Sequence, residues 1–167
     1  MPIYGQKEQK SNPMDTAIKE AYGNRVRVRV CGLCWQEEEL LMVNHRGLSE
    51  GAFWAPPGGG LEFGESVEAC LQREFAEETG LDVTPKKFLF ACEFMRDALH
   101  TIELFFHVST TGGSLRTGTD PELGIIEEVR FMTLHEVADI PERNRHGILS
   151  RVASADQLMK LTGFFTI

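Results

Sequence analysis

The chain has 167 residues, 42% of them hydrophobic, which suits one domain with a sizeable core. Its formal net charge of -8 argues against general binding to a nucleic-acid backbone or an anionic membrane. The first residues lack the apolar segment of a signal peptide, and no run approaches the ~20 apolar residues of a spanning helix. We therefore expect a soluble, cytoplasmic protein that binds neither membrane nor nucleic acid.

The N-terminal region is polar and irregular, and we predict that residues 1–24 form an arm, with a partner-docking segment as an equal alternative. Within it, "MDTAIKEAYG" has the pattern of a short helix that Gly23 ends. The alternation in "RVRVRV" (25–30) then predicts a half-buried strand whose three arginines face solvent. No linker, internal repeat or charge block follows, so residues 25–167 are predicted to be a single domain.

Four cysteines, Cys31, Cys34, Cys70 and Cys92, are few for a disulfide scaffold of this length. The "CGLC" at 31–34 has the spacing of a redox or zinc pair. In a strand, however, residues three apart point to opposite faces. We expect reduced thiols packed in the core.

Further along the chain, several short apolar runs predict the rest of a sheet. "LLMVN" (40–44) is expected to pair with the first strand, and "HRGLSEGAFWAPPGGG" (45–60) to form a long loop. Residues 66–79 predict a helix that Glu65 or Ser66 caps and Gly80 ends. After it we expect a hairpin of 86–95 and 101–109, a mobile surface loop (110–124), a strand (127–134) and one or two helices beyond Pro141. This order predicts a mixed sheet with helices covering its faces, of the α/β or α+β class.

The acidic residues of the predicted helix are placed unusually. At about 100° per residue, Val67, Leu71 and Phe75 form the buried stripe. On the opposite side lie Glu68, Ala69, Gln72, Ala76 and Thr79. Glu78 projects between Val67 and Leu71, with Glu74 beside it, and Glu77 lies at the stripe's far edge. A solvated acidic face would not share the apolar stripe, so this alternative loses most of its weight.

Buried carboxylates are costly unless they are paired or bound to a metal, and three together repel one another. A magnesium ion, which prefers oxygen ligands, would relieve both problems. Residues three and four apart on a helix are neighbours, so Glu74, Glu77 and Glu78 can converge on one small volume. Arg73, four residues before Glu77, can brace them from the side.

Residues 59–81, "GGLEFGESVEACLQREFAEETGL", resemble the Nudix box, the signature of the Nudix hydrolase family. Every signature position is present: Gly59, Glu65, Arg73, Glu74, Phe75, Glu77, Glu78, Gly80 and Leu81. The resemblance implies an α/β fold, an α/β/α sandwich around a mixed sheet. It also implies hydrolysis of a nucleoside diphosphate linked to another group, with Mg²⁺ or Mn²⁺ as cofactor and a small-molecule nucleotide as substrate. A homodimer is compatible with it.

The resemblance also implies roles for individual residues. Glu74, Glu77 and Glu78 match the family's catalytic, metal-binding glutamates, and the carbonyl of Gly58 matches a further ligand. Gly59, Glu65 and Arg73 match supporting positions. The group that accepts the proton from water varies within the family, which leaves Glu74, Glu122, Glu127 and Glu128 as candidates. For Glu127 and Glu128, an exposed strand end is an equal alternative.

Substrate contacts are less defined. Arg46 can pair with a phosphate, because a guanidinium forks onto such oxygens. Trp54, Phe53 or Phe105 can stack on a base, although aromatic residues in strands more often belong to the core. The five histidines show no ligand spacing and are read as structural or exposed.

Two functions are compatible with the sequence: a metal-dependent pyrophosphohydrolase, and a non-catalytic nucleotide-binding module of the same fold. The motifs of several narrower Nudix classes, including those for ADP-ribose and dinucleoside polyphosphates, are absent. A sensing module often loses acids of the box, so the complete box favours the enzyme.

Overall fold

A computed structural model describes residues 13–49, 51–121 and 123–167 of the chain. The helices are α1 (Pro13–Tyr22), α2 (Val67–Thr79), α3 (Leu134–Asp139) and α4 (Ala155–Lys160), with short 3₁₀ helices η1 (Glu142–Asn144) and η2 (Gly147–Arg151). The strands are β1 (Arg25–Gln36), β2 (Glu39–Ser49), β3 (Gly51–Ala55), β4 (Gly58–Gly60), β5 (Leu81–Arg96), β6 (Leu99–Gly113), β7 (Ile126–Thr133) and β8 (Gly163–Thr166). No helix among these residues is long and apolar enough to cross a membrane.

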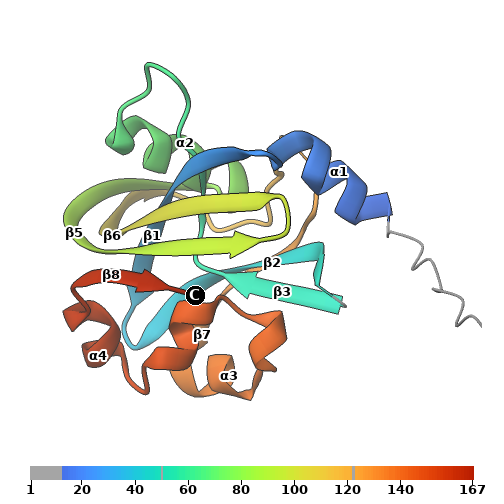
Figure 1. The fold of residues 1–167 in the computed structure, drawn as a ribbon. Helices are drawn as coiled ribbons and strands as arrows, with labels where there is room; N and C mark the ends of the chain where they lie inside the picture. The colour runs from blue at the N-terminus through green and yellow to red at the C-terminus, as the bar shows by residue number, and fades with distance from the viewer. Residues whose placement is uncertain (1–12, 50, 122) are drawn as a thin grey trace, which may run out of the picture.

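The strands form one mixed sheet in the order β3-β2-β1-β6-β5-β8, with β4 added to β1 and β7 to β2. The pairs β1–β6 and β5–β8 are parallel, and the other pairs are antiparallel. Helix α2 lies over one face of the sheet, and α3 and α4 lie on the other side (Figure 1). The predicted α/β class with a mixed sheet is confirmed.

Alternation along β1 divides the core into two layers. Val30 and Cys34 pack with Leu71 and Phe75 of α2, whereas Cys31 and Leu33 pack in the opposite layer. All four cysteines of the chain are free and buried. The prediction of core thiols is therefore confirmed, because the strand sends Cys31 and Cys34 to opposite faces.

The long loop predicted over residues 45–60 is wrong. Strand β2 continues to Ser49, β3 returns beside it with Trp54 opposite Asn44, and β4 pairs with β1 so that Gly58 lies opposite Cys31. Polar residues and glycines hide this part of the sheet from the hydrophobic pattern, because its pairing depends on backbone hydrogen bonds. The expected hairpin after α2 and the strand near 127–134 are confirmed as β5, β6 and β7, the first two being longer than expected.

The N-terminal helix is also present, and it ends beside Gly23, whose N–H donates to the carbonyl of Lys19 at 2.8 Å. Ile18 of this helix is buried, and the guanidinium of Arg27 lies 3.6 Å from the centre of the Tyr22 ring. The prediction that all three arginines of residues 25–30 face solvent is therefore wrong. Val26 and Val28 are 60% and 37% exposed, whereas Arg29 turns inward because Glu103 and the carbonyl of Gly58 accept its hydrogen bonds. The division into an arm (1–24) and a domain (25–167) stays a prediction.

The segment after β6, predicted to be mobile, is fastened to the end of α2. The N–H groups of Arg116, Gly118 and Thr119 donate to the carbonyls of Thr79, Glu78 and Glu77 at 2.9, 2.8 and 3.0 Å. The last carbonyls of a helix lack partners within the helix, so this segment supplies them. The prediction of a mobile loop is therefore wrong for residues 114–119, which hold in place the helical turn that carries Glu77 and Glu78.

Gly118→Ala is expected to lower the free energy of unfolding by about 2 kcal/mol, the scale of overpacking in a tight site. A Cβ at this position would overlap the carbonyl oxygen of Glu77. Urea denaturation would measure the change. Gly112→Ala is the matched control, because its Cβ would approach only the carboxylate of Asp82, at 2.9 Å, which can move away. Equal stability of the two variants would show that the segment is not packed tightly on α2.

Candidate active site

Helix α2 begins and ends at the residues that the sequence predicts. Ser66 is the N-cap, and its Oγ accepts a hydrogen bond from the N–H of Ala69 at 3.1 Å. Gly80 follows the helix with a left-handed φ of 72°. One assignment on the helix is wrong: Thr79, expected on the solvent side, is buried. Its hydroxyl donates to the carbonyl of Phe75 at 2.7 Å, which satisfies the polar group inside the core.

Two of the three candidate metal-binding acids lie in the buried stripe, as the helical pattern predicts. Glu74 is 8% exposed and Glu78 is 4% exposed. Glu78 Oε2 accepts from the N–H of Gly58 at 2.9 Å, and its Oε1 lies 3.8 Å from His45 Nε2. The carboxylate of Glu74 packs against Gly59, where a Cβ would overlap it. The strand β4 and the helix therefore meet through these carboxylates.

Arg73 braces the acidic cluster from the side. Its Nε lies 2.8 Å from Glu65 Oε1, and its terminal nitrogen NH1 lies 2.7 Å from Glu74 Oε1 and 3.4 Å from Glu77 Oε2. Its other terminal nitrogen donates to the carbonyl of Gly60 at 3.1 Å. The hydrogen bonds from Arg73 lower the pKa of Glu65. One guanidinium thus ties β4 to both the start and the middle of α2.

The electrostatics of the cluster are unfavourable, because two carboxylates are buried side by side. Burial, and next the negative charge of Glu78, raise the pKa of Glu74 to about 7, although Arg73 and Arg29 act in the opposite direction. A like charge and desolvation both disfavour an ionised carboxylate. Bringing a cation to this place would lower the pKa of Glu74 again.

The donor set suits a hard divalent ion. Glu74 and Glu78 offer carboxylate oxygens, and Gly58, whose N–H donates to Glu78, adds a carbonyl oxygen next to them. Gly58 has a φ of 151°, and a Cβ there would overlap the carbonyl oxygen of Val30, so only glycine fits. In the described part of the chain, no three His, Cys, Asp or Glu side chains are already gathered at one point. Glu77 instead faces Arg73 and would have to turn in order to join.

A buried network beside this cluster was not predicted. Arg29 donates to Glu103 Oε1 at 2.8 Å and to the carbonyl of Gly58 at 2.6 Å, and His146 Nε2 lies 2.6 Å from Glu103 Oε2. Burial would raise the pKa of Glu103, but His146 and Arg29 outweigh it and hold the pKa at about 2. The sequence did contain a sign of this buried carboxylate, because alternation along β6 puts Glu103 on the same face as the core residue Phe105.

The two expected substrate contacts, Arg46 and Trp54, differ in their exposure to solvent. The side chain of Arg46 is 64% exposed, with Nε 3.9 Å from Glu127 Oε1. Trp54 is 7% exposed in the core layer opposite α2, with the guanidinium of Arg130 5.3 Å from its ring centre. A ring so buried has little face to offer to a base, and the core alternative given for Trp54 fits this placement better.

The candidate proton acceptors are also separated. Glu74 lies in the cluster, while Glu127 and Glu128 are exposed on β7 beside Arg46 and Arg130. Glu122 lies outside the described residues.

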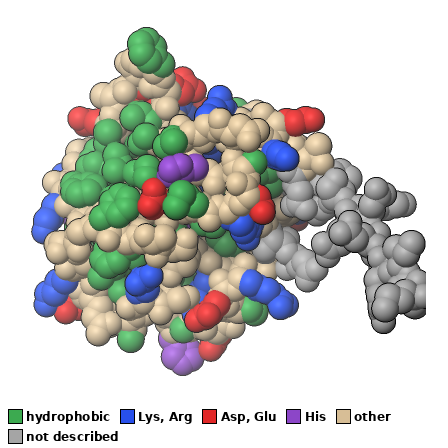
Figure 2. Space-filling model, in the orientation of Figure 1, with side chains coloured by type: hydrophobic (Ala, Val, Ile, Leu, Met, Phe, Trp, Pro, Cys, Tyr) green, Lys and Arg blue, Asp and Glu red, His purple; other side chains and the backbone are tan. Residues whose placement is uncertain are grey.

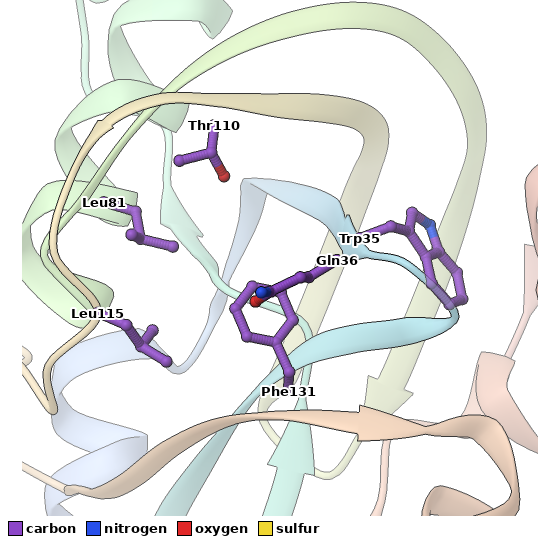
Figure 3. Close-up of a pocket in the computed structure, with 6 residues that line it drawn as sticks. All are labelled: Trp35, Gln36, Leu81, Thr110, Leu115 and Phe131. Atoms are coloured by element: carbon purple, nitrogen blue, oxygen red, sulfur yellow. The ribbon is translucent and has the colours of Figure 1, made fainter.

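A pocket of about 380 Å³ lies elsewhere in the molecule (Figure 3). It is lined by Trp35, Gln36, Leu81, Thr110, Leu115 and Phe131, none of which is a candidate site residue. On the face shown in Figure 2, lysines and arginines are scattered among other side chains rather than gathered into one basic patch.

Known proteins resemble this chain in sequence. A family model described as the NUDIX domain matches residues 23–151. An ADP-ribose pyrophosphatase of Methanocaldococcus jannaschii is 32% identical over 112 residues, which cover 66% of this chain and 63% of that protein. A nucleoside triphosphatase, NudI, of Salmonella heidelberg is 42% identical over 72 residues, covering 38% of this chain and 50% of the relative. The chain thus spans less than two thirds of the length of these relatives.

Solved structures show the same fold. A NUDIX hydrolase from Nitrosomonas europaea aligns with a TM-score of 0.66 and 19% identity, over 76% of this chain and 85% of the other.

The raised pKa of Glu74 predicts how the stability of the metal-free protein depends on pH. Between the ordinary value of 4.5 and about 7, the folded state keeps the proton on Glu74 and the unfolded chain releases it. The free energy of unfolding therefore gains a contribution that falls with rising pH, by at most about 1.4 kcal/mol per unit. Urea denaturation in a chelator across this window would show it. Glu74→Gln should remove the contribution, and Glu68→Gln, on the exposed side of α2, should keep it. Parallel pH profiles of the parent and Glu74→Gln would contradict it.

Proposed function

Since the chain belongs to the Nudix domain family, we propose that it is a Mg²⁺- or Mn²⁺-dependent pyrophosphohydrolase. Its substrate would be a nucleoside diphosphate linked to another group, cleaved when water attacks phosphorus. The observation that carries this proposal is the burial of Glu74 and Glu78 together on α2, within a complete signature. The activities for which two relatives are named, ADP-ribose pyrophosphatase and nucleoside triphosphatase, support this substrate class.

In this proposal, the acids and one carbonyl hold the cation. Glu74, Glu77, Glu78 and the Gly58 oxygen are the ligands, and Nudix hydrolases generally use divalent cations. When bound, such an ion neutralises phosphate oxygens and lowers the pKa of its water. Glu65 and Arg73 keep Glu74 and Glu77 in position, because one guanidinium contacts all three carboxylates. Gly59 leaves room for the carboxylate of Glu74.

The same observation weighs against a non-catalytic binding module. A protein that only recognised a nucleotide would gain nothing from two acids buried side by side, because their repulsion lowers its stability. Exposed basic side chains such as Arg46 would hold the phosphates without that cost. The buried pair is better explained by a cation that takes part in the reaction.

The direct test is hydrolysis of a panel of nucleoside triphosphates, nucleotide sugars, ADP-ribose and dinucleoside polyphosphates, with and without Mg²⁺ or Mn²⁺. Metal-dependent release of phosphate, pyrophosphate or a nucleoside monophosphate from one class would support the enzyme and identify its substrate. A folded protein that binds these compounds and the metal, yet hydrolyses none of them, would favour the binding module.

Glu78→Gln is expected to reduce kcat by at least about 100-fold at saturating Mg²⁺, more than the loss of a supporting residue usually causes. The amide oxygen can still accept from the N–H of Gly58, so the fold should be retained, but one metal charge is removed. Steady-state kinetics and circular dichroism would measure both effects. Glu68→Gln on the same helix should keep the parental kcat. Parental turnover in Glu78→Gln would remove this residue from the metal site.

Arg46→Ala is expected to raise KM about tenfold, equivalent to ~1.4 kcal/mol of lost phosphate binding, with a smaller change in kcat. Its exposed guanidinium is free to leave the weak contact with Glu127. Initial rates over a range of substrate concentrations would separate the two constants. Arg96→Ala, at the C-terminal end of β5, is the control. An unchanged KM would place Arg46 outside the substrate site.

A further inference from the structure

Both backbone polar groups of Gly58 are held by side chains. Its N–H donates to Glu78 Oε2 at 2.9 Å, and its carbonyl accepts from Arg29 at 2.6 Å. A carbonyl oxygen has two lone pairs, so the bond from Arg29 leaves one free for a metal ion. The direction of the remaining lone pair then depends on where the guanidinium of Arg29 is fixed.

Glu103 fixes that guanidinium. It is 4% exposed, and each of its carboxylate oxygens has one partner: Oε1 accepts from Arg29 at 2.8 Å, and Oε2 faces His146 Nε2 at 2.6 Å. Charge-assisted hydrogen bonds of this kind are strong and directional when buried. Because Glu103 lies on β6 and Arg29 on the parallel strand β1, directly opposite it, the sheet itself sets their spacing.

His146 completes the arrangement from the C-terminal part of the chain. Its Nδ1 accepts a hydrogen bond from the backbone N–H of Ile148 at 3.3 Å. The ring hydrogen therefore sits on Nε2, which donates a hydrogen bond to Glu103. The backbone N–H of His146 donates to the carbonyl of Trp54 at 2.8 Å, and Asn144 Nδ2 donates to the carbonyl of Ala52 at 2.7 Å. The segment 144–148 thus holds both β3, which leads into Gly58, and Glu103.

We propose that Glu103, Arg29 and His146 are positioning residues, which orient the Gly58 carbonyl toward the metal ion and thereby set the metal affinity of the site. The inference rests on the proposed function, because it takes Gly58 and Glu78 as metal ligands. It adds three residues outside the signature, from β1, β6 and the C-terminal segment, to the machinery of the site.

The test is the affinity for Mn²⁺ alone, measured by calorimetric titration without substrate. In Glu103→Gln, the amide oxygen can still accept from Arg29, but the amide N–H groups then face the N–H of His146. We expect the Kd for Mn²⁺ to rise about tenfold, the lower end for a lost supporting contact. The KM for the nucleotide, measured at saturating Mn²⁺, should stay at the parental value. A merely structural role would lower the unfolding midpoint and leave the Kd unchanged.

A matched control exists on the neighbouring strands. Glu93 Oε1 lies 2.9 Å from His100 Nε2, a pair of the same chemistry that does not touch Gly58. Glu93→Gln should leave the Kd for Mn²⁺ unchanged. Arg29→Lys is the second variant if Glu103→Gln does not fold, because a single ammonium cannot reproduce the fork between Glu103 and Gly58. It should raise the Kd to a similar extent.

The outcomes separate the inference from the function on which it rests. If the parent binds Mn²⁺, Glu78→Gln does not, and the folded Glu103→Gln and Arg29→Lys variants bind within about twofold of the parent, the positioning role is overturned and the metal site stands. If the parent itself binds no Mn²⁺, both proposals fail. If Glu93→Gln weakens binding as much as Glu103→Gln, the effect is general and the inference is also overturned.

Discussion

The repulsion between Glu74 and Glu78 is the constraint on which the rest of the candidate site depends. Two carboxylates removed from water on one face of a helix would normally be replaced by apolar residues or would separate. Here they remain together because positive groups lie on two sides. Arg73 contacts Glu74 directly, and Arg29 lies beyond Gly58, where its charge acts on both acids. The architecture around α2 serves to keep this unfavourable pair in place.

The core layers and the sheet hold α2 and β4 rigidly in place. Leu71 and Phe75 anchor the middle of α2 in one core layer, and the carbonyls of its last turn are held by the segment after β6. On the other side, β4 is joined to β1 by backbone pairing. A helix and a strand that are fixed independently cannot move apart to let water reach the acids. Burial, and next the charge of Glu78, therefore keep the pKa of Glu74 raised.

The sequence predicted the extent of α2 and the burial of Glu74 and Glu78, because both follow from local rules. Ser66, Gly80 and the 3.6-residue period determine where α2 lies and which face is buried, without reference to the remainder of the chain. The contacts of Arg29 with Glu103 and of Glu103 with His146 join residues 74 and 43 positions apart, which no local pattern encodes. Strand β3 was missed for a related reason, since its pairing with β2 depends on backbone groups that every sequence carries.

The attachment of residues 114–119 to α2 has a consequence for how such a site can diversify. The three bonds to Glu77, Glu78 and Thr79 all come from backbone N–H groups, which are the same for nearly every residue type. Apart from Gly118, whose lack of a side chain is required, the segment is free to exchange its side chains without moving the acids. Related chains can therefore vary the chemistry at this edge of the site while they inherit the same helix end.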